Sequence, residues 1–270
     1  MNPNRRPTGL LLVILALGLV ALAAMPPAAA HPEDEFCTPG EDGLDPALCL
    51  ALSELDNAKR VASGAILNAA GEPRGFWSTF GLYVSIGIGH ILPAGLDHIL
   101  FVLALFLSST RLKALVIQIS AFTVAHTATL GLTAAGLISP PSSIVEALIA
   151  ASIAFVAIEN LIVKDMPRWR PLIVVAFGLV HGMGFAGFFG ELGLPDEQFW
   201  SGLIGFNVGV EIGQLSIVVV AFVLGYGLRR RLTRLVKDHW YRRGLVVPAS
   251  LLIGATGLVW SVERTLAALN

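Results

Sequence analysis

Six apolar runs, separated by short polar links, make up most of the chain after residue 94. They lie at about residues 95–109, 113–134, 143–163, 171–190, 199–227 and 245–267. An α-helix needs about 20 apolar residues to cross the hydrocarbon core of a bilayer. The pattern therefore predicts an all-α polytopic membrane protein, with a bundle of about six transmembrane helices over residues 93–267.

A further apolar run covers residues 76–92 and stops at Pro93. It is apolar enough to span the membrane. A span here would reverse the next helix and place Arg111 and Lys113 on the outer side. We therefore expect an interfacial or re-entrant helix on the outer face, broken at Pro93, with a spanning helix as the alternative.

The links between the runs differ in charge. The first, third and fifth links carry lysine and arginine, most densely over residues 228–244, whereas the second is uncharged and the fourth is acidic. Positively charged links of membrane proteins stay in the cytoplasm. The pattern predicts a multi-pass protein of the bacterial inner membrane with a periplasmic mature N-terminus and a periplasmic C-terminus.

The first 75 residues precede the bundle. Residues 1–30 resemble a cleaved signal peptide, with Arg5 and Arg6 before an apolar core and small residues at 28–30. An uncleaved anchor is the alternative. Residues 31–75 form an acidic periplasmic segment in which we expect a disulfide between Cys37 and Cys49. The alternative is a metal-collecting patch made by these thiols, His31 and the carboxylates.

Composition supports the membrane and narrows the partners. Hydrophobic residues make up 55% of the chain, charged residues 14%, and the mean hydropathy is +0.74. A soluble domain of this length needs more charge to cover its surface. The net charge of -1 gives no reason to expect nucleic acid as a partner. The lipid bilayer is the expected environment, and nothing in the chain predicts an oligomeric state.

Polar residues inside the apolar runs are few and costly, which marks them as functional candidates. Imidazole and carboxylate ligands suit nickel, cobalt or zinc, and the lack of thiolates in the runs suits copper(I) poorly. The candidate metal-handling residues are His90, Asp97, His98, His126, His181 and Glu211, with Thr123, Glu146, Asn207 and Gln214 as secondary polar residues.

The run at 199–227 has two distinct faces. Asn207, Glu211 and Gln214 recur at helical spacing on one face. Gly205, Gly209 and Gly213 recur on the opposite face, which predicts a close-packed seam against a neighbouring helix.

Counting about 1.5 Å per residue from the outer ends of the runs spreads the candidates along the outer half of the bundle. The depth is roughly 5 Å for His98, 10–12 Å for His126 and 13–18 Å for His181. We expect His98 to be a direct ligand and Asp97 to orient a neighbouring imidazole, that of His126 or His181.

Several segments resemble the HupE/UreJ family of bacterial membrane proteins. The resemblance covers about residues 76–227 and rests on GHILPAGLDHILFVLALFL, AFTVAHTATL, VEALIAASIAFVAIENL, FGLVHGMGFAG and FNVGVEIGQL. It implies a secondary nickel transporter connected with nickel supply to enzymes such as hydrogenase and urease. The metal-handling positions that the resemblance implies here are His90, Asp97, His98, His126 and His181.

Three hypotheses follow. The first is a permease for a divalent transition metal, nickel first and cobalt second, with the metal as substrate, no catalytic residues and no enzymatic activity. The second is an intramembrane zinc hydrolase, which requires three ligands at one depth and an open fourth position. The third is a membrane metal-binding scaffold or sensor. A spread of ligands along a path favours the first hypothesis, and convergence on one point favours the second.

Overall fold

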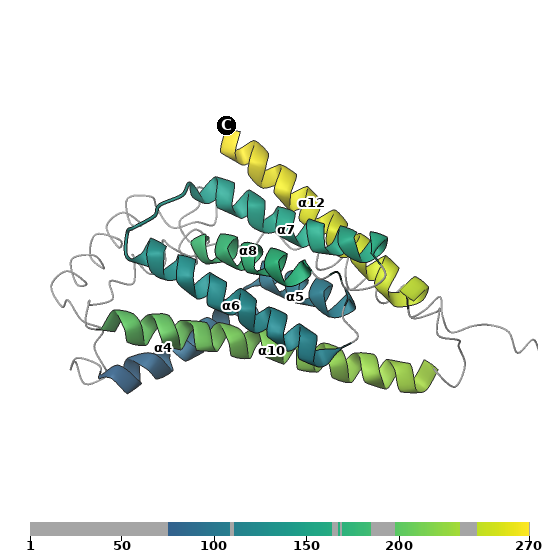
Figure 1. Cartoon of the computed structure of the whole chain (residues 1–270), viewed down its shortest axis with the longest axis horizontal. Helices are drawn as coiled ribbons and strands as arrows, with labels where there is room; N and C mark the ends of the chain where they lie inside the picture. Colours follow the sequence, from purple (N-terminus) through teal and green to yellow (C-terminus); the bar gives the residue numbers. More distant parts are fainter. Residues whose placement is uncertain are drawn as a thin grey trace, which may run out of the picture.

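The computed structural model describes residues 75–108, 111–163, 167, 169–184, 198–232 and 242–269, without side chains for 226–232. The predicted signal peptide, the acidic segment and the predicted Cys37–Cys49 disulfide lie outside this part of the chain. Within it, every element is helical, as the apolar runs predict (Figure 1).

The helices follow the predicted runs closely at most ends. They are α4 (Phe76–Ile91), α5 (Leu96–Ser108), α6 (Leu112–Ala134), α7 (Ser142–Ile162), α8 (Arg170–Met183), α10 (Phe199–Leu232) and α12 (Val247–Leu269), with a π-helical turn η2 (Arg242–Val246) before α12. Helix α8 ends earlier than predicted, at Met183, with Gly184 as its C-cap. Helix α10 continues beyond the predicted end at 227, because arginine is a good helix former and does not stop a helix.

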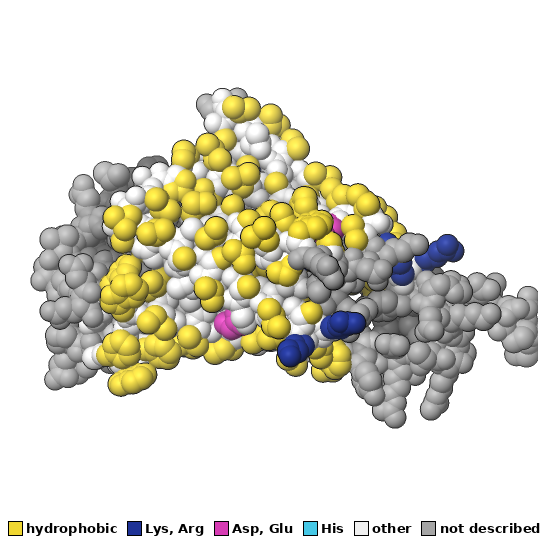
Figure 2. Space-filling model, viewed as in Figure 1, with side chains coloured by type: hydrophobic (Ala, Val, Ile, Leu, Met, Phe, Trp, Pro, Cys, Tyr) yellow, Lys and Arg dark blue, Asp and Glu magenta, His cyan; other side chains and the backbone are white. Residues whose placement is uncertain are grey.

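Four of these helical stretches are long and apolar enough to cross a membrane: α6, α7, α10 through Gly225, and α12 together with η2. Helices α4 and α5 qualify only as a pair, which is bent by 72° at the break between them, and α8 is shorter. The count of six spans therefore stays a prediction. In Figure 2 the described part of the visible face carries mostly hydrophobic side chains with a few acidic ones among them, and lysine and arginine side chains lie at one end, as expected for a helical membrane protein.

The predicted glycine seam on α10 packs against α4. A Cβ atom at Gly209 would collide with the backbone carbonyl of Val84 and lie 2.9 Å from the Cα of Gly87. Going along α10, the paired positions are Ser201 with Phe76, Gly213 with Ile91, and Gly225 with Phe106. Residue numbers rise together along α10 and along the bent pair α4–α5. The bent pair therefore runs in the same direction as α10 and does not reverse.

Two other helix pairs complete the bundle. Helix α8 lies against α6, where a Cβ atom at Gly178 would be 2.5 Å from the carbonyl oxygen of Phe122. Helix α12 lies against α7, where a Cβ atom at Gly257 would be 2.7 Å from the amide nitrogen of Ala154. Small residues at these contacts let backbones approach closely, as in other membrane helix pairs. Helix α5 is enclosed by these pairs, and its residues Phe101, Val102 and Leu105 are fully buried.

The α4–α10 seam gives a packing prediction. We expect Gly209→Leu to lower the melting temperature of the purified protein by several degrees, because overpacking costs about 1–3 kcal/mol. Gly81→Leu is the matched control on α4, where a Cβ atom would meet nothing within 4 Å. Equal melting temperatures for the two variants in detergent would contradict the seam.

Candidate metal centre

The break between α4 and α5 brings two histidines together. His90 lies in the last turn of α4, and His98 lies in the first turn of α5. Their ring centroids are 5.0 Å apart. A Cβ atom at Gly95 would collide with the backbone carbonyl of His90, so glycine is needed for the chain to pass this closely. The sequence motif around Pro93 thus creates the site by bending the chain.

The third histidine, His126, comes from α6 and has a defined protonation pattern. Its Nδ1 lies 3.0 Å from the side-chain oxygen of Asn207 on α10. The Asn207 amide nitrogen donates to the carbonyl of Leu203 at 2.8 Å, which fixes the orientation of the amide. An amide oxygen only accepts, so His126 Nδ1 carries the proton and Nε2 keeps a lone pair.

A similar argument applies to His181 on α8. The hydroxyl of Ser152 donates to the carbonyl of Ile149 at 2.7 Å. Its single proton is thereby used, so at 2.9 Å it accepts a hydrogen bond from Nε2 of His181. The lone pair of His181 therefore lies on Nδ1. A Cβ atom at Gly182 would collide with the carbonyl of His126, so glycine is what allows α8 this close to α6.

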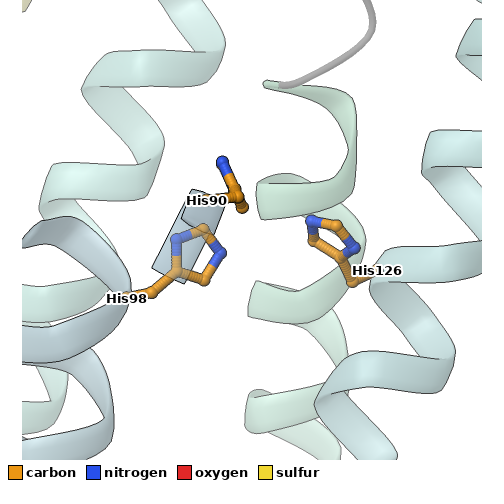
Figure 3. A group of neighbouring side chains, drawn as sticks. All are labelled: His90, His98 and His126. Carbon is orange, nitrogen blue, oxygen red and sulfur yellow. The ribbon is translucent and has the colours of Figure 1, made fainter. Parts of the chain in front are cut away.

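Three of the histidines converge. One ligand nitrogen each from His90, His98 and His126 lie within 4.8 Å of one another, and Figure 3 shows their rings around a common space. The ring of His181 lies 5.0 Å from that of His98. Within the described residues, Nε2 of His98, Nε2 of His126 and Nδ1 of His181 are buried without a hydrogen-bond partner. Buried nitrogens with free lone pairs are the arrangement that a metal ion requires.

Aromatic side chains enclose this group. The ring of Phe122 lies 5.0 Å from that of His181, 6.0 Å from that of His98 and 6.2 Å from that of His126. The ring of Phe206 lies 5.4 Å from that of His90. Because these aromatic rings are apolar, the histidine nitrogens are the polar groups that face the site. A metal ion that enters it would replace its water ligands with imidazole nitrogens.

The predicted spread of the histidines in depth is wrong. Counting residues from the ends of straight spans assumes helices of similar tilt. The bend of 72° between α4 and α5 breaks that assumption, because it turns the start of α5 toward the middle of α6. His98 and His126 therefore meet at one point.

Asp97 has a different partner from the predicted one. Its carboxylate accepts hydrogen bonds from both terminal nitrogens of Arg264 on α12, at 3.0 and 3.4 Å, rather than from an imidazole. Arg264 also donates to the backbone carbonyl of Glu146 at 3.1 Å. Asp97 thus forms an ion pair with Arg264 beside the histidines, and Glu146 joins the contact only through its backbone carbonyl. A lone arginine inside an apolar helix is the sequence signal that points to such a carboxylate.

Glu211 is likewise outside the group of converging nitrogens. Its carboxylate accepts hydrogen bonds from the hydroxyls of Ser120 and Thr123 on α6, and Thr123 also lies 3.1 Å from the side-chain oxygen of Gln214. Among the hydrogen bonds of the described residues, the one that joins a predicted secondary residue to a converging histidine is that of Asn207 with His126. Thr123 and Gln214 instead join Glu211.

The sequence reasoning missed a buried ion pair at the other end of α7. Arg170 on α8 lies 3.4 Å from Glu159, and both side chains are at most 5% exposed. Arg170 also donates to Asn160 at 3.3 Å, and Asn160 donates to the carbonyl of Ala104 on α5 at 2.8 Å. This group ties α5, α7 and α8 together. Arg170 ends the positively charged third link, and its position there gives no sign of this pairing.

The partner of His126 gives a second testable prediction. Asn207→Leu should weaken nickel binding by roughly 10–100-fold, because outer-shell partners fix the tautomer and orientation of a ligand histidine. Thr133→Val is the control, since the hydroxyl of Thr133 bonds only backbone carbonyls of its own helix in the described contacts. Isothermal titration calorimetry with Ni²⁺ on the purified proteins measures the difference. Equal affinities would show that Asn207 does not support a metal ligand.

Comparison with known families gives one match. The family model described as "HupE / UreJ protein" matches residues 68–264. Comparison with curated proteins and with solved structures finds no match. The matched range contains all the converging histidines and both ion-pair groups.

Proposed function

The chain belongs to the HupE/UreJ family, and we propose that it is a secondary transporter of a divalent transition-metal ion, nickel first and cobalt second. Members of this family are metal permeases and not enzymes, which supports metal transport in general. We place the protein in the bacterial inner membrane with both mature termini in the periplasm, on the charge of its links. Delivery of the ion to a nickel-enzyme maturation pathway is part of the proposal.

The geometric observation behind the proposal is the convergence of His90, His98 and His126 from three different helices, which supports a metal site, while the family supports transport. His181 on a fourth helix lies beside them. A site built from several helices changes shape when those helices move relative to one another. Transport requires such a change, because the ion must be released on the side opposite to its entry.

The lack of a charged ligand among the converging side chains also suits a site through which a metal ion passes. The converging ligands are imidazoles, and the carboxylate of Asp97 is already paired with Arg264. Neutral ligands leave the double charge of the ion uncompensated in an apolar surrounding, which limits how tightly it is held. An ion that is held moderately can leave again, as a transporter requires.

We propose that α4 and α5 form one broken crossing, with the histidines at the break. Both helices follow α10 in the same direction, so no reversal is needed between them and Arg111 stays on the cytoplasmic side. On this assignment the Asp97–Arg264 pair lies on the outer side of the histidines and the Glu159–Arg170 pair on the inner side. These pairs close the two ends of the route.

The competing hypothesis, an intramembrane zinc hydrolase, requires ligands that converge on one point. Three histidines do converge. By the criterion set from the sequence, this convergence on its own favours the enzyme. The choice of transport rests on membership in the HupE/UreJ family, whose members are metal permeases and not enzymes. We therefore do not propose hydrolysis.

The direct test is uptake by proteoliposomes that contain the purified protein. We expect saturable uptake of labelled Ni²⁺, competition by Co²⁺, and loss of both with His126→Ala. His239→Ala is the matched control, because His239 lies in the predicted cytoplasmic link and outside the described residues. If the protein binds Ni²⁺ but moves none across the bilayer, it is a scaffold or sensor and the transport proposal is wrong.

A further inference from the structure

A second polar group lies between α6 and α10, close to the histidines. The hydroxyl of Ser120 donates to one carboxylate oxygen of Glu211 at 2.6 Å, and the hydroxyl of Thr123 lies 2.5 Å from the other. The side-chain oxygen of Gln214 lies 3.1 Å from the same Thr123 oxygen. We call these four residues the Glu211 group. All of the atoms in these contacts are oxygens.

The Glu211 group has more acceptors than protons. The oxygen of Thr123 carries one hydrogen but lies within 3.2 Å of three acceptors: the carbonyl of Ile119, the carboxylate of Glu211 and the amide oxygen of Gln214. A proton on Glu211 would let the carboxyl donate to Thr123 and would leave two acceptors for the threonine hydrogen. Reversing the Gln214 amide would also leave two, so this contact is compatible with a protonated Glu211 but does not require one.

The Glu211 carboxylate has no arginine or lysine within ion-pair distance among the described residues. Helix α10 packs against α4, α5 and α6. The titratable and charged groups on these helices and the preceding residue are Tyr83, His90, Asp97, His98, Arg111, Lys113 and His126. The described contacts of the Glu211 carboxylate are instead hydroxyls of α6. A carboxylate inside a membrane helix without a basic partner is stable only with a proton or another cation.

The donor set identifies the class of cation. Oxygen ligands suit protons and hard cations, whereas nickel and cobalt prefer the imidazole nitrogens of the neighbouring site. Glu211 is four residues after Asn207, and Thr123 is three residues before His126, so the two sites are about one helical turn apart on the same two helices. Each site therefore bridges α6 and α10 and acts on the same helix contact.

We propose that the carboxyl of Glu211 binds the proton whose movement is coupled to metal transport. The inference rests on the proposed transport function and names its coupling ion. The step is a proton transfer from water to the carboxylate on one side of the membrane and its release to water on the other. No bond to the metal forms or breaks in this step. The metal occupies the histidine site, and the proton occupies the Glu211 group.

The experiment uses the full protein in proteoliposomes, with the membrane potential clamped at zero by K⁺ and valinomycin. For the unaltered protein, an imposed pH gradient should change the initial rate of Ni²⁺ uptake several-fold. Glu211→Gln should keep exchange of internal for external Ni²⁺ within about twofold and lose the response to the gradient, because glutamine imitates the protonated form. Glu263→Gln, at an exposed glutamate of α12, should retain both.

The possible failures are distinguishable. If the unaltered protein shows no Ni²⁺ exchange at all, the transport function is wrong. If exchange persists but the unaltered protein ignores a pH gradient, or Glu211→Gln still responds to one, the coupling proposal is overturned and transport survives. A response to a sodium gradient in place of a pH gradient would also overturn the assignment to a proton.

Discussion

His98→Ala should abolish Ni²⁺ uptake while the protein still folds and inserts in the membrane. Its ligand nitrogen is one of three within 4.8 Å of one another, and its ring lies 5.0 Å from those of both His90 and His181. Removing it leaves two converging ligands. We expect a loss of affinity larger than the roughly 10–100-fold that the loss of an outer-shell partner costs.

The measurement is initial uptake of labelled Ni²⁺ at limiting concentration, together with gel filtration to show that the variant is folded. His239→Ala again serves as the control. Retained uptake by folded His98→Ala would mean that the histidine group is structural.

Arg170→Met should produce the largest loss of stability among single substitutions at the inner ion-pair group. Glu159 is paired with Arg170 at 3.4 Å, and both side chains are at most 5% exposed. Removing the arginine leaves a buried carboxylate without its partner, which costs about 3–5 kcal/mol. The melting temperature of the purified protein should fall by 10 °C or more, on the order expected for such a free-energy change.

The double variant Glu159→Leu/Arg170→Met provides the matched test. Replacing both members of a buried pair by apolar residues is often neutral or stabilising, so most of the lost stability should return. If the double variant is as unstable as the single one, the cost comes from lost packing and not from the unpaired charge. If it is stable but transports no Ni²⁺, the pair is needed for the route.

Much of the fold could be predicted from the sequence because hydrophobic runs and glycine spacing are local signals. The bounds of α6 and α7 differ from the predicted runs by at most one residue at each end. The glycine face of α10 was correctly predicted to pack against a neighbour, although spacing alone did not say that the neighbour is α4. The π-helical turn at the start of the last helix carried no recognised signal.

The site was only partly predictable for a physical reason. A histidine in an apolar run is visible in the sequence, and the predicted candidates His90, His98 and His126 do lie together in the structure. Which polar groups meet depends on tilt and bend, which spacing does not give. The partner of Asp97 lies 167 residues away on α12, so the pairing with Arg264 depends on the tertiary structure and could not be predicted from the local sequence.

The separation of Glu211 from the histidines changes the interpretation of the whole polar set. The sequence places Asn207, Glu211 and Gln214 on one helix face, which predicts that they line a single site. In the structure that face carries two: Asn207 supports His126, while Glu211 and Gln214 meet hydroxyls of α6 one turn away. Nitrogen and oxygen donors are thereby sorted into neighbouring sites of different chemistry.

X-ray absorption spectroscopy at the nickel edge of the metal-loaded protein can show whether His90, His98 and His126 hold the transported ion. We expect one Ni²⁺ per chain and a first shell that contains about three imidazole nitrogens and no sulfur. His98→Ala protein loaded at high nickel should lose one of these imidazoles. A first shell of oxygens alone, or one that His98→Ala leaves unchanged, would contradict this assignment.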